Sequence, residues 1–275
     1  MKSVEDIINA AHQHGFGHLA AEVAQSARRT LLLRPSKDVA PAVGTSKFGG
    51  CPDLPDGIVW PESGPENEEL GTSYPQYQYE PGPMRFIAQI NLSELPFVPD
   101  GLKLPSSGLI YFFAAVQKID FPLTGCFGED WHVFSSSDHE KLVRASPPIP
   151  SLKFIEASRF ADLGVDENTG IVLPEHRMEF HEDWIPDHKI LYGCGLGAGP
   201  YTAYFRGCPQ HRLGGYPNHI QSPVDAADFS MLAQFDTDHS IGLIWAFGGR
   251  AFFMGNSMEI ELGNFHKIIL ITQCS

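Results

Sequence analysis

The feature of this chain that most constrains its fold is a segment that occurs twice. Residues 84–91 read MRFIAQIN and residues 229–236 read FSMLAQFD, so that each residue has a counterpart 145 positions later. Two further pairs of blocks repeat in the same order, namely 49–53 with 214–218 and 108–113 with 249–254. Repetition of several blocks in one order predicts two related structural units.

The local patterns within the repeated blocks are those of β-strands. Apolar and polar residues alternate from Met84 to Leu92, which is typical of a strand with one buried face. Residues 109–116 are almost all apolar and predict a strand covered on both faces, and residues 241–254 and 265–272 are also strand-like. The chain has 27 glycines, 22 prolines and 19 phenylalanines, which favours many turns between short aromatic strands. We therefore expect a mainly β (α+β) fold, in which two related β-sheet units from an internal duplication pack into one body.

The first 35 residues have a different pattern. Ser3 is a suitable N-cap, and helical spacing of apolar residues continues past the glycines at 15 and 17 and ends before Pro35. The predicted organisation is an N-terminal helical segment (1–35), a first β repeat (36–146), a connecting segment (147–190) and a second β repeat (191–275). These form one structural domain, because a few strands alone are only marginally stable. A long loop at 61–83 is expected only in the first repeat.

Charge and cysteine content narrow the classes of partner. The chain has 19 basic and 33 acidic residues, a net charge of −14, which repels nucleic acid backbones and anionic membranes. Such a charge either attracts a basic protein partner or only keeps the protein in solution. Its five cysteines are odd in number and contain no CxxC pair, so reduced thiols in the cytoplasm are expected. We expect a cytoplasmic protein that binds neither nucleic acid nor membranes.

The repeated blocks resemble the YwqG-like family, a set of bacterial proteins of unknown function. The residues that carry the resemblance include SKFGGCPDLP at 46–55, Trp60-Pro61, HRLGGYPN at 211–218 and LAQFDTD at 232–238. The resemblance implies a β-rich fold made by duplication, with an N-terminal helix. It implies no reaction and no catalytic residue.

Polar residues within the repeated strands are the first candidates for a site. Gln89 and Asn91 correspond to Gln234 and Asp236, and residues two apart in a strand lie on one face, on which we also expect Ile87. Buried amides need hydrogen-bond partners, so the two sets either bond to each other or line a polar cleft where the units join.

The glycine turns supply the second group of candidates. Asp53 and Asn218 follow the two Gly-Gly pairs, and a cation, Lys47 or Arg212, precedes each pair by two residues. The turns are mainly structural, since glycine permits positive φ, whereas two cations on equivalent loops can grip an anion or remain solvated. Trp60 and the tyrosines at 74, 77 and 79 are a binding rim or a loop fixed by its rings.

Metal and cofactor motifs fail on spacing. Residues from Asp236 through Asp238 begin like a calcium loop, but Ile241 and Phe247 stand where Gly and Glu are required. The histidines at 176, 181 and 188 have no zincin spacing, and the glycine run at 193–199 is not followed by a helix pattern. We expect no metal and no cofactor. The candidate ligand-binding residues are Lys47, Asp53, Trp60, Gln89, Asn91, Arg212, Asn218, Gln234, Asp236 and Asp238.

Two functional hypotheses follow. The first is a non-enzymatic protein that recognises a protein or peptide partner, similar to an antitoxin or immunity protein, because no catalytic signature is present and the surface is acidic. The alternative is a small-molecule binder or hydrolase with its site between the two repeats, because each repeat supplies a cation and a glutamine at corresponding positions.

Overall fold

A computed structural model describes residues 3–36, 39–63, 82–114, 131–137, 141–148, 172–187, 189–190, 209–221, 228–245 and 248–273. The three tyrosines of the 61–83 loop, most of the connecting segment before residue 172, His188 and the glycine run at 193–199 lie outside these residues. None of the described helices is both long and apolar enough to cross a lipid bilayer.

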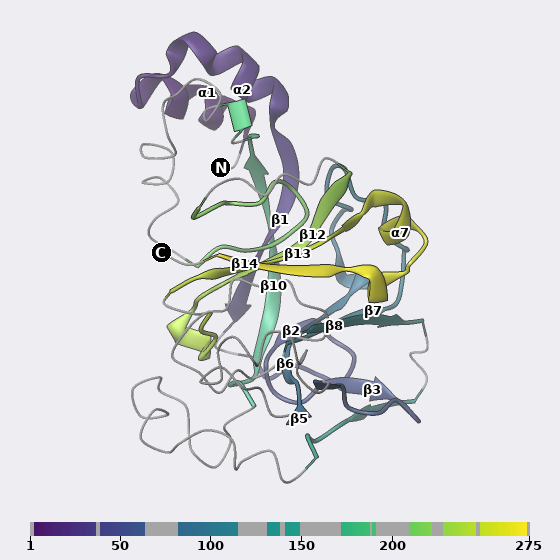
Figure 1. The fold of residues 1–275 in the computed structure, drawn as a ribbon. Helices are drawn as coiled ribbons and strands as arrows, with labels where there is room; N and C mark the ends of the chain where they lie inside the picture. The colour runs from purple at the N-terminus through teal and green to yellow at the C-terminus, as the bar shows by residue number, and fades with distance from the viewer. Residues whose placement is uncertain are drawn as a thin grey trace, which may run out of the picture.

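Two short helices and a strand make up the N-terminal segment. Helix α1 (Val4–Gln13) is capped by Ser3, whose Oγ accepts the N–H of Asp6 at 3.1 Å, as its sequence predicts. Helix α2 (Ala20–Ser26) packs on α1 through a small apolar cluster, and the two lie at one end of the molecule (Figure 1). The prediction of helix up to Pro35 is wrong from residue 28, where strand β1 (Arg28–Ser36) begins. Alternate residues Leu31 and Leu33 are buried in the main core, so burial outweighs helix propensity there.

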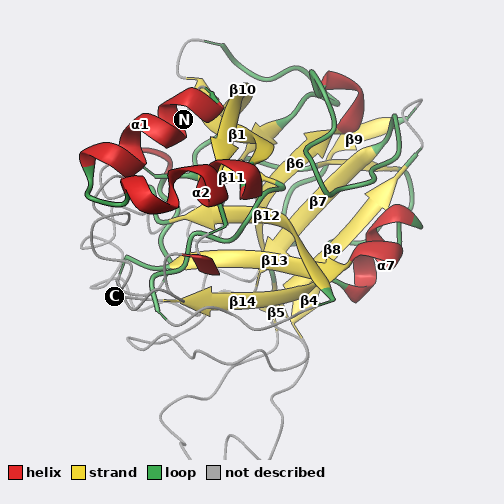
Figure 2. Cartoon of the chain, turned by 90° about the horizontal axis from the view of Figure 1, so that it is seen from above, coloured by secondary structure: helices red, strands yellow, loops and turns green. Residues whose placement is uncertain are grey.

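Within the described residues, ten strands form one antiparallel sheet in the order β14-β13-β12-β11-β1-β10-β2-β6-β7-β8, which is nearly closed on itself. Figure 2 shows the strands from above. Strands β1 and β10 (His176–Ile185) pair along the whole of β1 and form the centre. We call the strands on either side of this centre the first arm and the second arm. The first arm consists of β2 (Lys47–Phe48), β6 (Arg85–Asn91), β7 (Leu109–Ala114) and β8 (Trp131–Ser136). The second arm consists of β11 (His211–Leu213), β12 (Phe229–Asp236), β13 (Arg250–Asn256) and β14 (Ile269–Gln273).

Smaller elements complete the fold. Two-stranded sheets pair β3 (Asp53–Pro55) with β9 (Leu142–Arg144) and β4 (Glu62–Ser63) with β5 (Gly82–Pro83). Helix α7 (Ser257–Glu261) follows β13, and short 3-10 turns occupy Gly17–Leu19, Leu92–Glu94, His239–Ile241 and Phe265–Lys267.

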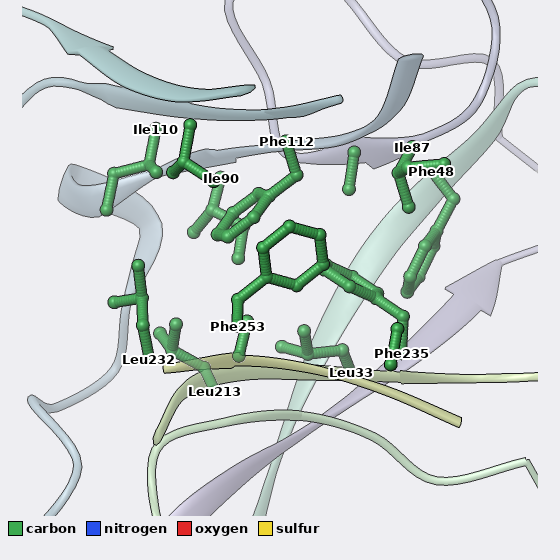
Figure 3. Close-up of a cluster of buried hydrophobic side chains, with 14 of the residues drawn as sticks. Leu33, Phe48, Ile87, Ile90, Ile110, Phe112, Leu213, Leu232, Phe235 and Phe253 are labelled. Carbon is green, nitrogen blue, oxygen red and sulfur yellow. The ribbon is translucent and has the colours of Figure 1, made fainter. Parts of the chain in front are cut away.

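The main hydrophobic core lies between the two arms. Figure 3 shows side chains of β6 and β7 pointing at side chains of β12 and β13. The ring of Phe112 lies 5.1 Å from that of Phe253 and 5.3 Å from that of Phe235, in edge-to-face geometry. The mainly β fold is therefore confirmed, and each arm covers an apolar face that would otherwise be exposed.

The strand predictions hold in part. Strand β7 is buried on both faces, as its apolar sequence predicts. In β6 a bulge between Phe86 and Ala88 interrupts the alternation. Ile87 therefore packs in the main core, whereas Gln89 pairs with Tyr111 on the opposite face, so the expectation that Ile87 and Gln89 share a face is wrong. Residues 241–245 form no strand beyond a single bridge, and β13 starts at Arg250.

Candidate functional site

The two Gly-Gly turns have the same geometry. Gly49 and Gly50 have φ of 57° and 67°, and Gly214 and Gly215 have φ of 72° and 82°. These left-handed values favour glycine over other residues, as the sequence indicates. In each arm the first glycine donates its N–H across the bulge of the neighbouring strand, from Gly49 to the carbonyl of Ile87 and from Gly214 to that of Leu232, both at 2.9 Å.

Gln89 joins the first turn to β6. Its Oε1 accepts the N–H of Asp53 at 2.8 Å, and its Nε2 donates to the carbonyl of Thr45 and to Oδ2 of Asp53, each at 2.8 Å. The side chain is fully buried, so every polar atom of the amide has a partner inside the protein. Gln89 therefore fixes the loop that carries Lys47 and Asp53.

In the second arm, Gln234 joins the second Gly-Gly turn to β12 in the same way. Its Oε1 accepts the N–H of Asn218 at 3.0 Å, and its Nε2 donates to the carbonyl of Gln210 at 2.9 Å and to Oδ1 of Asp236 at 3.0 Å. Each glutamine thus bonds within its own arm. The buried amides find partners locally, and no bond joins Gln89 to Gln234 in the described part of the chain.

Lys47 and Asp53 are the centre of the first polar cluster. Lys47 Nζ lies 3.3 Å from Asp53 Oδ2 and 2.9 Å from Glu175 Oε1, and Arg144 Nε lies 2.9 Å from Asp53 Oδ1. Burial of the Asp53 carboxyl acts to raise its pKa, but the bonds from Arg144, the Gly44 N–H and the Lys47 charge outweigh it and lower the pKa. The carboxylate is therefore ionised and held by two cations.

Asn91 and Trp60 have separate environments in the first arm. Asn91 Nδ2 donates to the carbonyl of Gly44 at 2.8 Å, and its Oδ1 accepts the N–H of Ser93 at 2.9 Å, capping the 3-10 turn after β6. The indole Nε1 of Trp60 donates to the carbonyl of Met84 at 2.8 Å, and its ring contacts Phe113 at 5.5 Å. Trp60 is buried in an apolar cluster on the outer face of the sheet, together with Tyr111, whose Oη donates to the Asp53 carbonyl at 2.7 Å.

The second polar cluster surrounds Arg212 and Arg250. Arg212 Nη2 lies 2.8 Å from Asp183 Oδ2 on β10, and the same atom donates to the side chain of Gln210. Arg250 Nε lies 2.6 Å from Asp236 Oδ1. Arg212 and Asp236 are almost fully buried, so these ion pairs act in a poorly screened environment.

Asp238 lies beside this cluster in contact with His211. Its Oδ2 is 3.3 Å from His211 Nε2, and its Oδ1 accepts the N–H of Ser240 at 2.8 Å. Burial acts to raise the pKa of Asp238, but these hydrogen bonds lower it to about 2. Asp238 thereby caps the short 3-10 turn His239–Ile241, where the sequence begins like a calcium loop.

The two cations singled out by the sequence do not meet. Strands β2 and β11 are separated by β10 and β1, three strand spacings or about 14 Å along the sheet. Lys47 is paired with Asp53 and Glu175, whereas Arg212 is paired with Asp183. The charged candidate residues therefore form two clusters, one in each arm, and Trp60 packs in the apolar cluster whose Tyr111 bonds to Asp53 of the first.

The sequence missed the partners that complete these clusters. Arg144 and Glu175 come from segments outside the repeated blocks, and Asp183 lies on a strand that no pattern predicted. Arg250 lies within a repeated block, but its counterpart is apolar, so the repeat gave no reason to select it. The described residues contain no group of three histidine, cysteine or acidic side chains placed to hold a metal ion.

A family model described as "Domain of unknown function (DUF1963)" matches residues 46–274. The match begins just before the first Gly-Gly turn and ends after β14, so it covers both arms and both polar clusters. The chain belongs to the DUF1963 family. No curated protein matches the chain. The description of the DUF1963 family names no activity.

Proposed function

We propose that this DUF1963 protein is a non-enzymatic binding protein that recognises a basic protein or peptide partner, as antitoxin and immunity proteins do. The observation that carries the proposal is a group of exposed aliphatic side chains bordering the small β3–β9 sheet, between 44% and 80% exposed, which we call the apolar patch: Val43, Ile58, Val59 and Val143. Clustered exposed apolar side chains mark interaction surfaces, whereas single ones are common.

The members of the patch belong to segments that are joined to the same two strands. Val143 lies on β9 and pairs with Leu54 of β3. Ile58 and Val59 follow the turn at the end of β3, which the Ile58 N–H closes on the Pro55 carbonyl. Val43 precedes Gly44, whose N–H donates to the Asp53 carboxylate where β3 begins. Gly44 and Arg144, the chain neighbours of Val43 and Val143, thus both bond to Asp53 of the first polar cluster.

The charge around the apolar patch favours a basic partner. Exposed acidic residues lie on either side of Ile58 and Val59 in the chain, Asp56 in the turn after β3 and Glu62 at the start of β4. The whole chain carries a net charge of −14. An apolar centre with a charged rim is the usual anatomy of a protein interface. An acidic rim speeds association with a basic partner and disfavours acidic ones.

The state of the first polar cluster also favours binding over catalysis. Lys47 and Asp53 are fully buried, and their charges are neutralised by each other, by Arg144 and by Glu175. A general acid, base or nucleophile has to reach its substrate. We therefore assign these residues to holding the loops of the first arm in place.

We further propose that the two arms arose by an internal duplication. The paired turns, paired glutamines and paired bulges, at 86/88 and at 231/233, support an internal duplication with repeats at 36–146 and 191–275. We also propose that the chain is a YwqG-like member of its family and acts in the cytoplasm. Neither idea is needed for the partner-binding test.

A matched pair of surface variants tests the proposed function. Val59→Glu combined with Val143→Glu charges the apolar patch, and Met258→Glu, on exposed residue 258 of α7, is the control. Each full-length chain is cross-linked in extract of its source cells, and partners are quantified by mass spectrometry. We expect a basic protein that is retained by Met258→Glu and lost with the double variant.

The partner is then purified and titrated calorimetrically. Affinity at least tenfold weaker for the double variant, and weakening with added salt, supports the proposal. Equal affinity for all three chains overturns it, and so does the finding that the double variant changes only self-association.

The alternative, a small-molecule binder or hydrolase with its site between the repeats, is favoured by one observation. In the second arm, the buried amide of Asn218 has no hydrogen-bond partner within the described residues. Lys47 and Arg212 lie on strands too far apart to bind one small ligand together, so any such site belongs to one arm.

A further inference from the structure

The two arms use the same scaffold but place different side chains on it. In the first arm Asp53 and Leu54 follow the glycine turn, and in the second arm Asn218 and His219 do. Both pairs are buried, and the first residue of each donates its N–H to the glutamine of its arm. An apolar leucine therefore fits the position that holds a histidine in the second arm.

Asn218 is the first sign that the second arm is built for a ligand. The residue is 1% exposed, and neither its Nδ2 nor its Oδ1 has a hydrogen-bond partner within the part of the chain that the structure describes. At the corresponding position, the Asp53 carboxylate is bonded to Arg144, Gly44 and Gln89. A buried amide without partners is rare, because it loses its hydration and gains nothing.

His219 is also buried and has a polar atom without a partner among the described residues. It is 5% exposed, its Nδ1 has no partner in the described residues, and its ring lies 5.6 Å from that of Phe252. Burial lowers the pKa of His219 to about 4, so the imidazole is neutral near pH 7. A neutral imidazole offers one donor and one acceptor to a ligand.

Arg250 fixes the backbone of this loop. In the first arm Tyr111 Oη donates to the Asp53 carbonyl at 2.7 Å, and in the second arm Arg250 Nη1 donates to the Asn218 carbonyl. The positive charge of Arg250 is matched by Asp236 at 2.6 Å. Arg250 therefore fixes the backbone at Asn218 without bonding to the Asn218 side chain. Because Asp236 neutralises the charge of Arg250, we do not expect this arginine to bind an anionic ligand.

We propose that Asn218 and His219, beside Phe252, form a site for a small neutral ligand with a planar donor–acceptor edge, as in a carboxamide or a nucleobase. An asparagine side chain presents a donor and an acceptor in one plane, which matches an amide or a base edge. The ring of Phe252 supplies an apolar wall. This site lies on the second arm and is separate from the apolar patch.

The physical basis is a conflict between stability and function. In the first arm a fully bonded aspartate, Asp53, and an apolar leucine, Leu54, occupy the same two positions, so the scaffold itself does not require a buried amide or imidazole without partners at 218 and 219. Residues that violate local packing rules without a compensating bond occur mainly at functional sites. A ligand that supplies both partners removes the conflict when it binds.

Ligand-observed NMR on the full-length chain tests the site with a defined panel of probes. The neutral planar probes are acetamide, nicotinamide, uracil and adenine, and acetate and toluene serve as controls. We expect saturation transfer to at least one planar probe and none to acetate or toluene. Binding of nicotinamide alone identifies a carboxamide, and binding of adenine or uracil identifies a base edge.

Two variants connect this binding to the site. Asn218→Leu and His219→Leu, the latter giving the residue found at the corresponding first-arm position, should each weaken the best probe at least tenfold. His219→Leu should melt at a higher temperature than the parent. His181→Leu, at a solvent-exposed histidine of β10, is the control and should bind like the parent.

The proposal is overturned by any of three results. These are no planar probe binding better than acetate, unchanged affinity in a folded His219→Leu variant, or a crystal structure with the best probe in which Asn218 contacts only an ordered water. The partner-binding test uses other residues, so failure of one proposal leaves the other standing.

Discussion

Gln89 and Gln234 make the same bond in two arms that lie on opposite sides of the central strands. Each side-chain carbonyl accepts the N–H of the residue four positions after the first glycine of its turn, Asp53 at 2.8 Å and Asn218 at 3.0 Å. Each side-chain amide also donates to the chain just before the turn. These glutamines therefore act as internal braces that substitute for missing strand pairing.

Replacing either brace should destabilise the protein. Gln89→Leu and Gln234→Leu each leave a buried backbone N–H and carbonyl without a partner, at about 1–3 kcal/mol for each orphaned group. We expect a loss of about 3 kcal/mol in the free energy of unfolding for each variant, measured by urea denaturation. A loss below about 1 kcal/mol would show that water replaces the amide.

The buried pair at Lys47 should matter far more than an exposed pair. Lys47→Met leaves the buried Asp53 with Arg144 as its remaining cation, and breaking such a pair costs about 3–5 kcal/mol. The matched control is Lys103→Met, because Lys103 is largely exposed and pairs with Glu261 at 3.0 Å. That control should cost at most about 1 kcal/mol. Equal effects in urea denaturation would contradict the burial argument.

The first glycine of the turn is confined by its neighbours as well as by its φ. A Cβ on Gly49 would lie 2.3 Å from the Pro174 carbonyl oxygen and 2.8 Å from Leu173 Cβ, whereas one on Gly57 would meet no atom within 4 Å. Both residues have positive φ, so Gly57→Ala should cost about 1–2 kcal/mol from backbone strain alone. Gly49→Ala should cost clearly more, and comparable melting temperatures for the two variants would refute the steric argument.

His219 should give the protein a measurable sensitivity to mild acid. Its pKa is about 4 when folded and 6.5 when unfolded, so lowering the pH protonates the unfolded chain first. The neutral imidazole makes its full contribution to the free energy of unfolding above pH 6.5. This contribution, about 3 kcal/mol, is lost as the pH falls toward 4. Burial is the main cause, and the charges of Lys189 and Arg250 add to it against Asp187.

The difference between parent and His219→Leu isolates this contribution, because all other titrating groups are shared. Urea denaturation at pH 7, 5.5 and 4.5 should show the parent losing stability relative to the variant as pH falls. Parallel pH profiles would show that His219 keeps its ordinary pKa.

Sequence reasoning succeeded where the determinants are local. The Gly-Gly turns, the Ser3 cap and the doubly buried β7 all follow from residues adjacent in the chain. It failed at β1, where the run of three leucines at 31–33 fits a helix as well as a strand, and at β10, whose charged sequence has no strand pattern. Both strands are formed by pairing with each other along their length.

The sequence alone determined where the glycine turns and several of the strands form, because turn chemistry and apolar alternation depend on neighbouring residues. Only the tertiary structure decided which charges meet. The bulges at 86/88 and 231/233 turn the polar residues to the outer face, and Arg144, Glu175 and Asp183 reach the clusters from distant segments. Among the described residues, burial then distinguishes a satisfied first cluster from the Asn218 amide and the His219 Nδ1, which have no partner, because the cost of a missing hydrogen bond depends on excluded water.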